Sequence, residues 1–259
     1  MKTSRPGGVD QTLTSRYECK YFVSAERADQ IRREIQPFLT LDPFSARAED
    51  HRYPVYSLYF DSPGLRLYQD TVEGARNRFK LRLRYYDAEA TGPVFAEVKK
   101  RNDQIVRKAR DLIEQDVLRA LGASKQDLAR TEFHQHLRQL GARPSLRIRY
   151  RREAWECRGQ TPVRITFDTK LQHGMPQAKD PFGALSDWEI TPLDGVILEL
   201  KFTERRPPWL ADLIHRFQLD KQSIPKYVMS VDAARASGDL RHHFAQSAIA
   251  PHWRHVSSL

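Results

Sequence analysis

The chain has 259 residues, 40% of them apolar and 29% charged, which is typical of a folded protein and excludes a disordered tail. Its 43 Lys and Arg against 33 Asp and Glu give a formal charge of +10, which favours anionic partners. Nowhere does the sequence hold the roughly 18 to 20 consecutive apolar residues of a membrane helix, and residues 1–14 lack the apolar centre of a signal peptide. We therefore expect a cytoplasmic protein whose residues 1–14 form a flexible leader.

Strands dominate the elements predicted along the chain. Alternating polarity predicts a first strand from Arg16, and Ser24 is the expected cap of a helix that runs to about Leu39. Further strands are expected at residues 53–61, 77–87, 93–100, 104–113, 144–156, 161–171 and 195–202. Further helices are expected at residues 114–122, 124–141 and 207–218. Few strand–helix–strand units occur, so we expect an α+β protein whose mainly antiparallel sheet closes into a barrel. One domain over residues 15–235 and a C-terminal tail at 236–259 are expected.

Charged and apolar side chains alternate on one predicted strand after another. In FKLRLRYY, Lys80, Arg82 and Arg84 share one face because successive side chains of a strand point to opposite sides. A Glu-x-Lys unit occurs on three strands, as Glu18 with Lys20, Glu97 with Lys99, and Glu199 with Lys201. On any single strand, this pattern is explained by an ordinary sheet with one face in water. The recurrence, with helices available to cover the apolar faces, predicts that the charged faces point into the barrel.

A barrel interior lined with arginine and lysine needs anions, since unpaired charge away from bulk water is costly. Linear chains of phosphate suit it, because arginine offers bidentate donors to phosphate oxygens and lysine a movable point charge. The carboxylates on the same faces have two explanations. They hold the basic side chains in place, or they bind Mg²⁺ or Mn²⁺ jointly with phosphate. The residues concerned are Glu18, Glu97, Asp168 and Glu199.

An ordered series of motifs resembles a known family. The motifs are RYECKYFV, SLYFDSP with Tyr68 downstream, KLRLRYY, FAEVKK, VRKAR, YRREAW, VRITFDTKL and ILELKF. Together they resemble the VTC domain of polyphosphate polymerases, part of the triphosphate tunnel metalloenzymes, whose CYTH members share the Glu-x-Lys motif. The resemblance runs from about Arg16 to Met229. It implies an eight-stranded antiparallel tunnel with helices packed outside.

The resemblance also implies roles for individual residues. Those expected to bind nucleotide or phosphate are Lys20, Arg82, Arg84, Lys99, Lys108, Arg110, Arg152, Arg164, Lys201 and Lys226. The expected catalytic residues are Arg82, Arg84, Lys99, Arg152 and Arg164. Glu199 is the expected metal ligand, with Glu18 and Glu97 as further candidates. Strand alternation gives a different choice in two places. It selects Arg107 in place of Lys108 and Arg110, and Arg147, Arg149 and Arg151 in place of Arg152.

The implied reaction is transfer of the γ-phosphate of ATP to a growing polyphosphate chain, with Mn²⁺ or Mg²⁺ as cofactor. Positioning and charge neutralisation account for most of such catalysis, which agrees with the lack of a Ser-His-Asp or Cys-His motif. Two alternatives to this reaction stay open. A tunnel phosphohydrolase or CYTH-type cyclase usually has a fuller Glu-x-Glu-x-Lys strand, whereas Arg16 stands two residues before Glu18. A binding module without turnover is favoured by Met229, which occupies the position of the second lysine in the family pattern PKYSKY.

Nucleic-acid binding ranks below these functions, because it normally needs an exposed basic stripe with stacking aromatic side chains. The expected partners are therefore ATP and inorganic polyphosphate or pyrophosphate, with no nucleic acid. The family's members in eukaryotes work within membrane complexes, so a membrane-bound partner is a further possible partner of this chain. The sequence does not indicate an oligomeric state.

Overall fold

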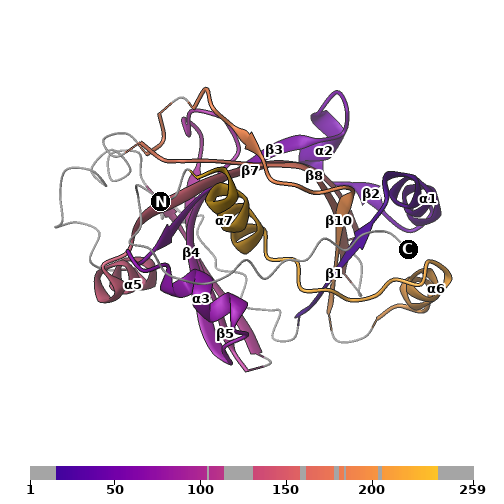
Figure 1. Cartoon of the computed structure of the whole chain (residues 1–259). Coiled ribbons are helices and arrows are strands. Elements are labelled where there is room, and N and C mark those ends of the chain that lie inside the picture. Colours follow the sequence, from indigo (N-terminus) through magenta and orange to yellow (C-terminus); the bar gives the residue numbers. More distant parts are fainter. Residues whose placement is uncertain are drawn as a thin grey trace, which may run out of the picture. The chain divides into compact units, whose positions relative to one another are not determined.

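The computed structural model describes residues 16–103, 105–113, 131–157, 162–177, 181–183, 185–203 and 206–238 (Figure 1). The expected leader, the expected helix at 114–122 and residues 239–259 of the expected tail lie outside these residues. The first residues of that tail, by contrast, still belong to a helix that ends at Ser237.

Antiparallel strands form the main part of the fold. They are β1 (Arg16–Val23), β2 (Thr40–Leu41), β3 (Tyr53–Asp61), β4 (Asn77–Tyr85), β5 (Val94–Asn102), β6 (Ile105–Ile113), β7 (Arg143–Cys157), β8 (Val163–Gly174), β9 (Glu189–Ile190) and β10 (Val196–Thr203). The helices are α1 (Ala25–Ile35), α2 (Pro43–Arg47), α3 (Arg66–Val72), α5 (Glu132–Leu140), α6 (Pro208–Arg216) and α7 (Lys226–Ser237). The α+β class and every strand expected from the sequence are confirmed.

Hydrogen bonding joins the strands in the order β1-β10-β8-β7-β3-β4-β5-β6, while β2 pairs with β7 and β9 with β8. The registers show antiparallel pairing, for example β1 with β10 and β4 with β5. The expected number of eight strands is found along this path. Among the described residues, however, the path is open, with β1 and β6 at its ends. The hydrogen-bonded closure expected of a barrel is therefore not formed by these strands.

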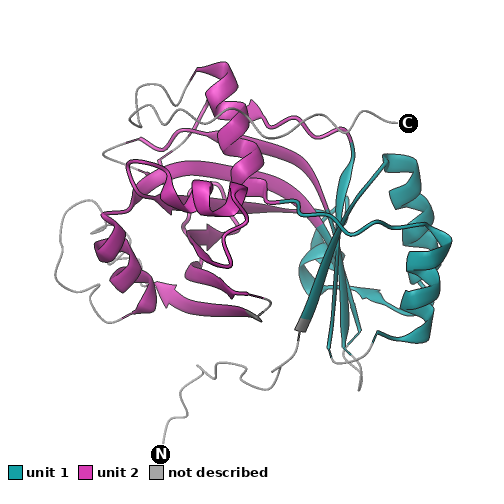
Figure 2. Ribbon diagram, turned by 60° about the horizontal axis from the view of Figure 1, so that its bottom comes forward, with its two compact units in different colours: residues 1–52, 153–167, 195–224 teal, residues 53–152, 168–194, 225–259 magenta. Residues whose placement is uncertain are grey.

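The chain divides into two compact units, which are coloured separately in Figure 2. Unit 1 comprises residues 1–52, 153–167 and 195–224, and unit 2 comprises residues 53–152, 168–194 and 225–259. Strands β7 and β8 each contribute residues to both units.

In unit 1, helices α1 and α6 lie side by side against one face of the strands (Figures 1 and 2). Ser24 caps α1, and Ile31 and Ile35 of this helix are fully buried. They pack with Leu198 and Leu200 of β10, in a core that includes Leu210 of α6. The helices therefore cover the apolar face of these strands, as the alternating pattern predicts.

In unit 2, the sheet has buried side chains on both faces. Helix α5 covers one face, where Phe133 packs with Leu81 and Leu83 of β4 and Val98 of β5. Thr131 caps this helix, and Gly141 ends it in the left-handed conformation with φ 56°. This core buries the apolar side chains of β4 and β5, the strands that carry Arg82, Arg84 and Glu97 on their other face.

The other face of the unit 2 sheet packs against α7 and α3, two helices that the sequence did not predict. Tyr227 and Val231 of α7 pack with Tyr59 of β3 and Tyr150 of β7, and Tyr68 of α3 belongs to the same core. The buried residues of α7 lie on one side of the helix, at Tyr227, Val228, Ser230, Val231 and Ala234. A serine is among them, and Met229 and Ala233 add apolar character to the remaining surface, so the sequence does not separate a polar from an apolar face. Helical periodicity is therefore a weak signal here.

Candidate functional site

A buried carboxylate forms the centre of the most strongly charged part of unit 2. Glu97 of β5 is 1% exposed, and the register places it opposite Arg82 of β4 and Arg110 of β6. Arg82 contacts its Oε2 through Nη2 at 2.7 Å and Nε at 2.8 Å. Lys108 Nζ lies 2.8 Å from Oε1, Arg110 Nε lies 3.4 Å from Oε1, and Arg84 Nε lies 3.9 Å from Oε2. We call these five residues the Glu97 cluster.

Charge and desolvation shift the pKa values in the Glu97 cluster. Burial acts to raise the pKa of Glu97, but the charges of Arg82, Arg84 and Lys108 outweigh it and hold this pKa far below its usual value. Desolvation and the neighbouring guanidinium groups lower the pKa of Lys108 to about 8, although its contact with Glu97 acts in the opposite direction. The carboxylate is therefore ionised at neutral pH, while Lys108 loses its proton in mild alkali.

Two tyrosines border the Glu97 cluster on β3 and β7. Arg82 Nη1 donates to the Tyr59 hydroxyl at 3.1 Å, and Arg84 Nη2 donates to the Tyr150 hydroxyl at 3.2 Å. Burial opposes ionisation of Tyr59, but the charges of Arg82 and Arg84 prevail and lower its pKa. Tyr59 also stacks on Tyr227 of α7, with 4.7 Å between the ring centroids. Alternation did not reveal these tyrosines, because they count as apolar in a pattern of polarity.

A second buried carboxylate lies in the same unit. Asp168 of β8 is 1% exposed and accepts two hydrogen bonds from Arg152, at 2.7 and 2.8 Å. Lys226, the first residue of α7, reaches the same carboxylate at 2.7 Å. Lys226 Nζ also lies 4.8 Å from the ring centroid of Tyr150. Asp168 thus holds two of the residues expected to bind phosphate, and we call these three the Asp168 cluster.

The position of Lys226 depends on a network that begins with the DSP motif. Asp61 accepts hydrogen bonds from the backbone N–H groups of Ser62, Leu67 and Tyr68, and from the Tyr227 hydroxyl at 2.8 Å. It therefore ties the first turn of α3 to the start of α7. Tyr68 in turn donates to Asp232 of α7 at 2.5 Å. The motif SLYFDSP and Tyr68 thus have a structural explanation.

The residues preferred by the motif resemblance are the ones found near these carboxylates. The β5–β6 ladder has no register shift, so Lys108 and Arg110 share the face of Glu97, while Arg107 lies opposite Lys100 on the other face. On β7, Arg152 shares its face with Tyr150, whereas Arg147 and Arg149 lie over Trp188. Counting the alternation of β6 from Ile113, which is buried, places Lys108 and Arg110 on the opposite, charged face.

Lys99 of β5 lies on the face of Glu97, two residues further along the strand. The register places it opposite Lys80 of β4 and Lys108 of β6. Three lysines thus follow one another across three neighbouring strands. Their mutual repulsion is relieved by any anion that approaches this edge of the cluster.

In unit 1, the two remaining Glu-x-Lys units pair with each other. The register places Glu18 opposite Lys201 and Lys20 opposite Glu199. Lys201 Nζ lies 2.6 Å from Glu199 and 4.0 Å from Glu18, and Lys20 Nζ lies 3.5 Å from Glu18. Glu199 is 5% exposed. Positive and negative charges are equal in number here.

Arg164 of β8 is also held by carboxylates of unit 1. It forms 2.6 Å contacts with both Asp42, the cap of α2, and Glu156 of β7. In unit 1, the three predicted cations Lys20, Lys201 and Arg164 thus contact four carboxylates, whereas the predicted residues of unit 2 are mostly cations.

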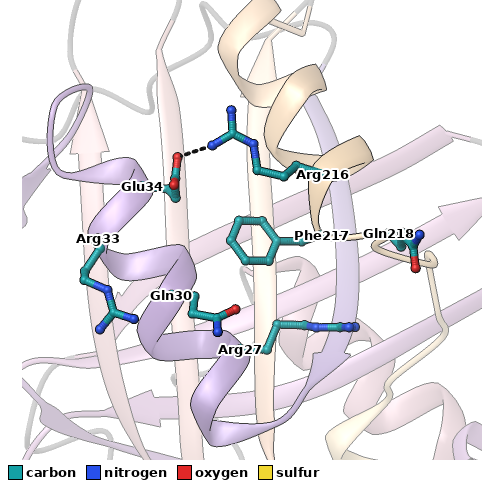
Figure 3. Close-up of a pocket in the computed structure, with 7 residues that line it drawn as sticks. All are labelled: Arg27, Gln30, Arg33, Glu34, Arg216, Phe217 and Gln218. Carbon is teal, nitrogen blue, oxygen red and sulfur yellow. Dashed lines mark hydrogen bonds and ion pairs between the residues drawn. The ribbon is translucent and has the colours of Figure 1, made fainter.

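A hollow of about 430 Å³ lies elsewhere in unit 1, beside α1 and α6 (Figure 3). It is lined by Arg27, Gln30, Arg33, Glu34, Arg216, Phe217 and Gln218. Arg216 forms an ion pair with Glu34 at 2.7 Å across it (Figure 3). The hollow contains none of the residues predicted from the strands.

The described residues contain no group of three or more His, Cys, Asp or Glu side chains placed to hold a metal ion. The candidate metal ligands also differ in their surroundings. Glu18 and Glu199 are neighbours whose charges are met by two lysines, whereas Glu97 is surrounded by four cations. No helix in the described part of the chain has the length and apolar character needed to cross a membrane.

The fold and these clusters define an antiparallel α+β protein with a cationic sheet face whose side chains are ordered by buried carboxylates. The chain belongs to the VTC domain family, whose model matches residues 15–235. It is 24% identical to vacuolar transporter chaperone complex subunit 4 of Schizosaccharomyces pombe over 86% of this chain and 37% of that protein. It is 22% identical to the subunit 4 of Trypanosoma brucei brucei over 85% of this chain and 34% of that protein. The chain thus spans little more than a third of these relatives.

Two solved structures are also similar. One is a candidate adenylate cyclase from Bacillus halodurans, with a TM-score of 0.47, 12% identity, and coverage of 82% of this chain and 95% of that chain. The other is a protein from Pyrococcus horikoshii, with a TM-score of 0.45, 12% identity, and coverage of 83% and 97%.

Proposed function

We propose that the chain is a polyphosphate polymerase, which transfers the γ-phosphate of ATP to the end of a polyphosphate chain and releases ADP. Membership of the VTC domain family supports this proposal. The observation that carries it is the charge of unit 2, where six cations surround two buried carboxylates. Such a surplus favours a polyanionic ligand, because four of the six side chains are at most 21% exposed and unneutralised charge is costly there.

The proposed roles follow from the chemistry of the side chains. Arg82, Arg84 and Arg152 would donate paired hydrogen bonds to phosphate oxygens, and Lys108 and Lys226 would add point charges. Phosphoryl transfer requires little covalent chemistry from the protein, since orientation and charge stabilisation supply most of the rate. Further phosphate-binding roles are proposed for Lys20, Lys99, Arg110, Arg164 and Lys201.

A divalent cation such as Mn²⁺ or Mg²⁺ is proposed as cofactor. Glu199 and Glu18 offer the hard oxygen donors that such ions prefer, and phosphate oxygens would have to complete the ligand set. When bound, the ion would neutralise charge on the phosphates. The chain's own contribution at this point is to hold the two carboxylates, and Lys201 now contacts both.

Incubation of the purified chain with ATP and Mn²⁺, followed by electrophoresis of the products, tests the proposal. Long polyphosphate chains and ADP are expected. ADP with orthophosphate and no chains would indicate a phosphohydrolase instead, and tight tripolyphosphate binding without turnover would indicate a binding module.

A pair of variants makes the test specific for the cationic face. Arg82→Ala should abolish chain synthesis, because its guanidinium lies between Glu97 and Tyr59. Arg149→Ala is the matched control, since this arginine of β7 lies over Trp188 on the other face of the sheet. Equal loss of activity in the two variants would argue against the proposed site.

A further inference from the structure

Glu97 has more positive partners than one carboxylate can neutralise. Both oxygens are engaged, since Arg82 contacts Oε2 and Lys108 contacts Oε1 at 2.8 Å or less. Arg84 and Arg110 approach the same two oxygens at 3.9 and 3.4 Å. Four cations thus converge on one negative charge. The side chains of Glu97 and Arg84 are buried, whereas those of Lys108 and Arg110 are 45% and 39% exposed.

We propose that Glu97 is a positioning residue, an internal counter-anion that holds the four cations in place and shares them with a phosphate group when one binds. The inference rests on the proposed function, because it takes a phosphate chain as the ligand of this face. It assigns to Glu97 a role that differs from that of a metal ligand.

The surroundings of Glu97 argue against a metal ion at this carboxylate. A divalent cation at this buried carboxylate would add two positive charges to the four already present, at distances where like charges repel. It would also have to displace Arg82 and Lys108 from the oxygens that they contact. Glu199, by contrast, shares its lysines with a second carboxylate.

One donor of the cluster is available to an anion. The Nε atom of Arg84 is buried and donates no hydrogen bond to any described residue, although Arg84 Nη2 is bonded to Tyr150. Arg84 is only 7% exposed, so water does not readily replace the missing acceptor. Leaving a charged donor unsatisfied is costly. A phosphate oxygen beside Glu97 would satisfy it.

The consequence is a linkage between stability and anion binding. Without Glu97, the four cations would repel each other with no internal compensation, and the folded state would be destabilised. A bound polyanion would replace the lost charge and restore stability. A carboxylate that served only to pack the sheet would not produce this dependence on the ligand.

The test measures thermal unfolding of Glu97→Gln at low ionic strength in EDTA, with and without 1 mM tripolyphosphate as the probe. Without the probe, the Tm should fall by roughly 10 °C, as expected for the loss of a buried paired charge. With it, at least half of this loss should be recovered, so that the ligand-induced rise in Tm exceeds that of the wild-type chain.

Glu153→Gln is the matched control. Glu153 is also buried, at 4% exposed, and accepts two hydrogen bonds from Arg32 in unit 1. Its loss should lower the Tm as well, but tripolyphosphate should raise the Tm of this variant only as much as that of the wild-type chain. Glu97→Asp keeps the charge and serves if Glu97→Gln does not fold. Its Tm should lie below that of the wild-type chain, because the shorter side chain draws the carboxylate away from the cations. Tripolyphosphate should raise this Tm more than it raises that of the wild-type chain.

Three results would overturn the inference. The first is an unchanged Tm for Glu97→Gln without the probe, and the second is a fall that tripolyphosphate restores no better than in Glu153→Gln. The third comes from repeating the measurement with Mn²⁺ in place of EDTA. A rise in Tm caused by Mn²⁺ in the wild-type chain and absent from Glu97→Gln would indicate a metal ligand. The proposed polymerase activity is judged separately from the products formed from ATP. Its failure, with the expected Tm pattern intact, would leave a polyphosphate-binding face positioned by Glu97.

Discussion

The two units use the same alternation of charged and apolar side chains but reach opposite charge balances. In unit 1, Lys20, Lys201 and Arg164 are met by four carboxylates within 4.0 Å. In unit 2, six cations share Glu97 and Asp168. The Glu-x-Lys motif therefore does not have the same binding role on every strand. What it can bind depends on the strands beside it, because the neighbours decide whether its carboxylate is matched or outnumbered.

The largest expected effect comes from removing two cations of unit 2. Arg82→Ala combined with Arg84→Ala should weaken tripolyphosphate binding roughly a thousandfold, since each lost charge-assisted hydrogen bond reduces affinity by one to two orders of magnitude. Calorimetric titration at fixed ionic strength measures the change. Arg147→Ala paired with Arg149→Ala removes two arginines from the other face of β7 and should leave the affinity within a few-fold. A similar loss in both pairs would mean that binding follows net charge and not the cluster.

The second prediction concerns unit 1. Glu199→Gln should lower the rate of chain synthesis with Mn²⁺ by roughly a hundredfold, the usual scale for loss of a metal ligand or of its support. Its affinity for tripolyphosphate in EDTA should stay within about threefold of the wild-type value, because the unit 2 cations are unchanged. Loss of affinity in EDTA would contradict the division of roles between the units.

The third prediction uses the pKa of about 8 at Lys108. Tripolyphosphate affinity should fall roughly tenfold between pH 7 and pH 9.5 as this ammonium loses its proton and one charge-assisted contact is lost. Stability should follow the opposite trend. Lys108 in the folded chain binds fewer protons than an ordinary lysine above pH 8, so its contribution to the free energy of unfolding rises from about pH 8 to the unfolded pKa.

Lys108→Met is the variant that isolates this titration. Its affinity should be low already at pH 7 and should change little up to pH 9.5. Arg107→Ala, one residue earlier and on the other face of β6, should retain the wild-type profile. A wild-type profile in Lys108→Met would assign the pH dependence to another group.

The smallest expected effect is at Met229. This partly buried side chain of α7 packs against the core that contains Tyr59 and Tyr150, one turn after Lys226. Met229→Lys should raise tripolyphosphate affinity by about threefold, because the gain in charge is offset by the lost packing of the methionine. Met229→Leu keeps the packing and should have no effect. A loss of binding in Met229→Lys would show that the position serves packing alone.

Much of the fold could be predicted from local pattern. Alternation located each long strand and separated Arg82 and Arg84 from Leu81 and Leu83, because the period of a strand is an intrinsic property of its backbone. Helix α1 was indicated by its cap at Ser24 and by Ile31 and Ile35, although it ends at Ile35 and not near Leu39. Helices α3 and α7 were missed. The first is short, and the second has a serine on its buried face and apolar residues such as Met229 elsewhere, so neither shows a clear amphipathic pattern.

The candidate site could be predicted only in part. The ordered motifs indicated the cations that lie near Glu97 and Asp168, whereas alternation selected Arg107 on β6 and Arg147, Arg149 and Arg151 on β7. On β7, Arg152 shares its face with the buried Leu146, Ile148 and Tyr150, so charged and apolar side chains do not separate between the two faces. On β6, the phase of the alternation depends on which apolar residue is buried. Ile113 and Ala109 fix that phase on β6 through contacts with other strands and α5. Tyr59, Asp61 and Tyr150 lie within the motifs SLYFDSP and YRREAW but were given no role, since a tyrosine is an ordinary strand residue and DSP an ordinary turn.

By itself, the sequence determined the excess of positive charge, the two faces of each strand and the family. These follow from composition, from the two-residue repeat of a strand and from the order of motifs. Only the tertiary structure decided that Glu97 is outnumbered by cations while Glu18 and Glu199 are matched by lysines. The electrostatic role of a carboxylate is set by charges within a few ångströms, and strand pairing brings those charges from distant parts of the chain.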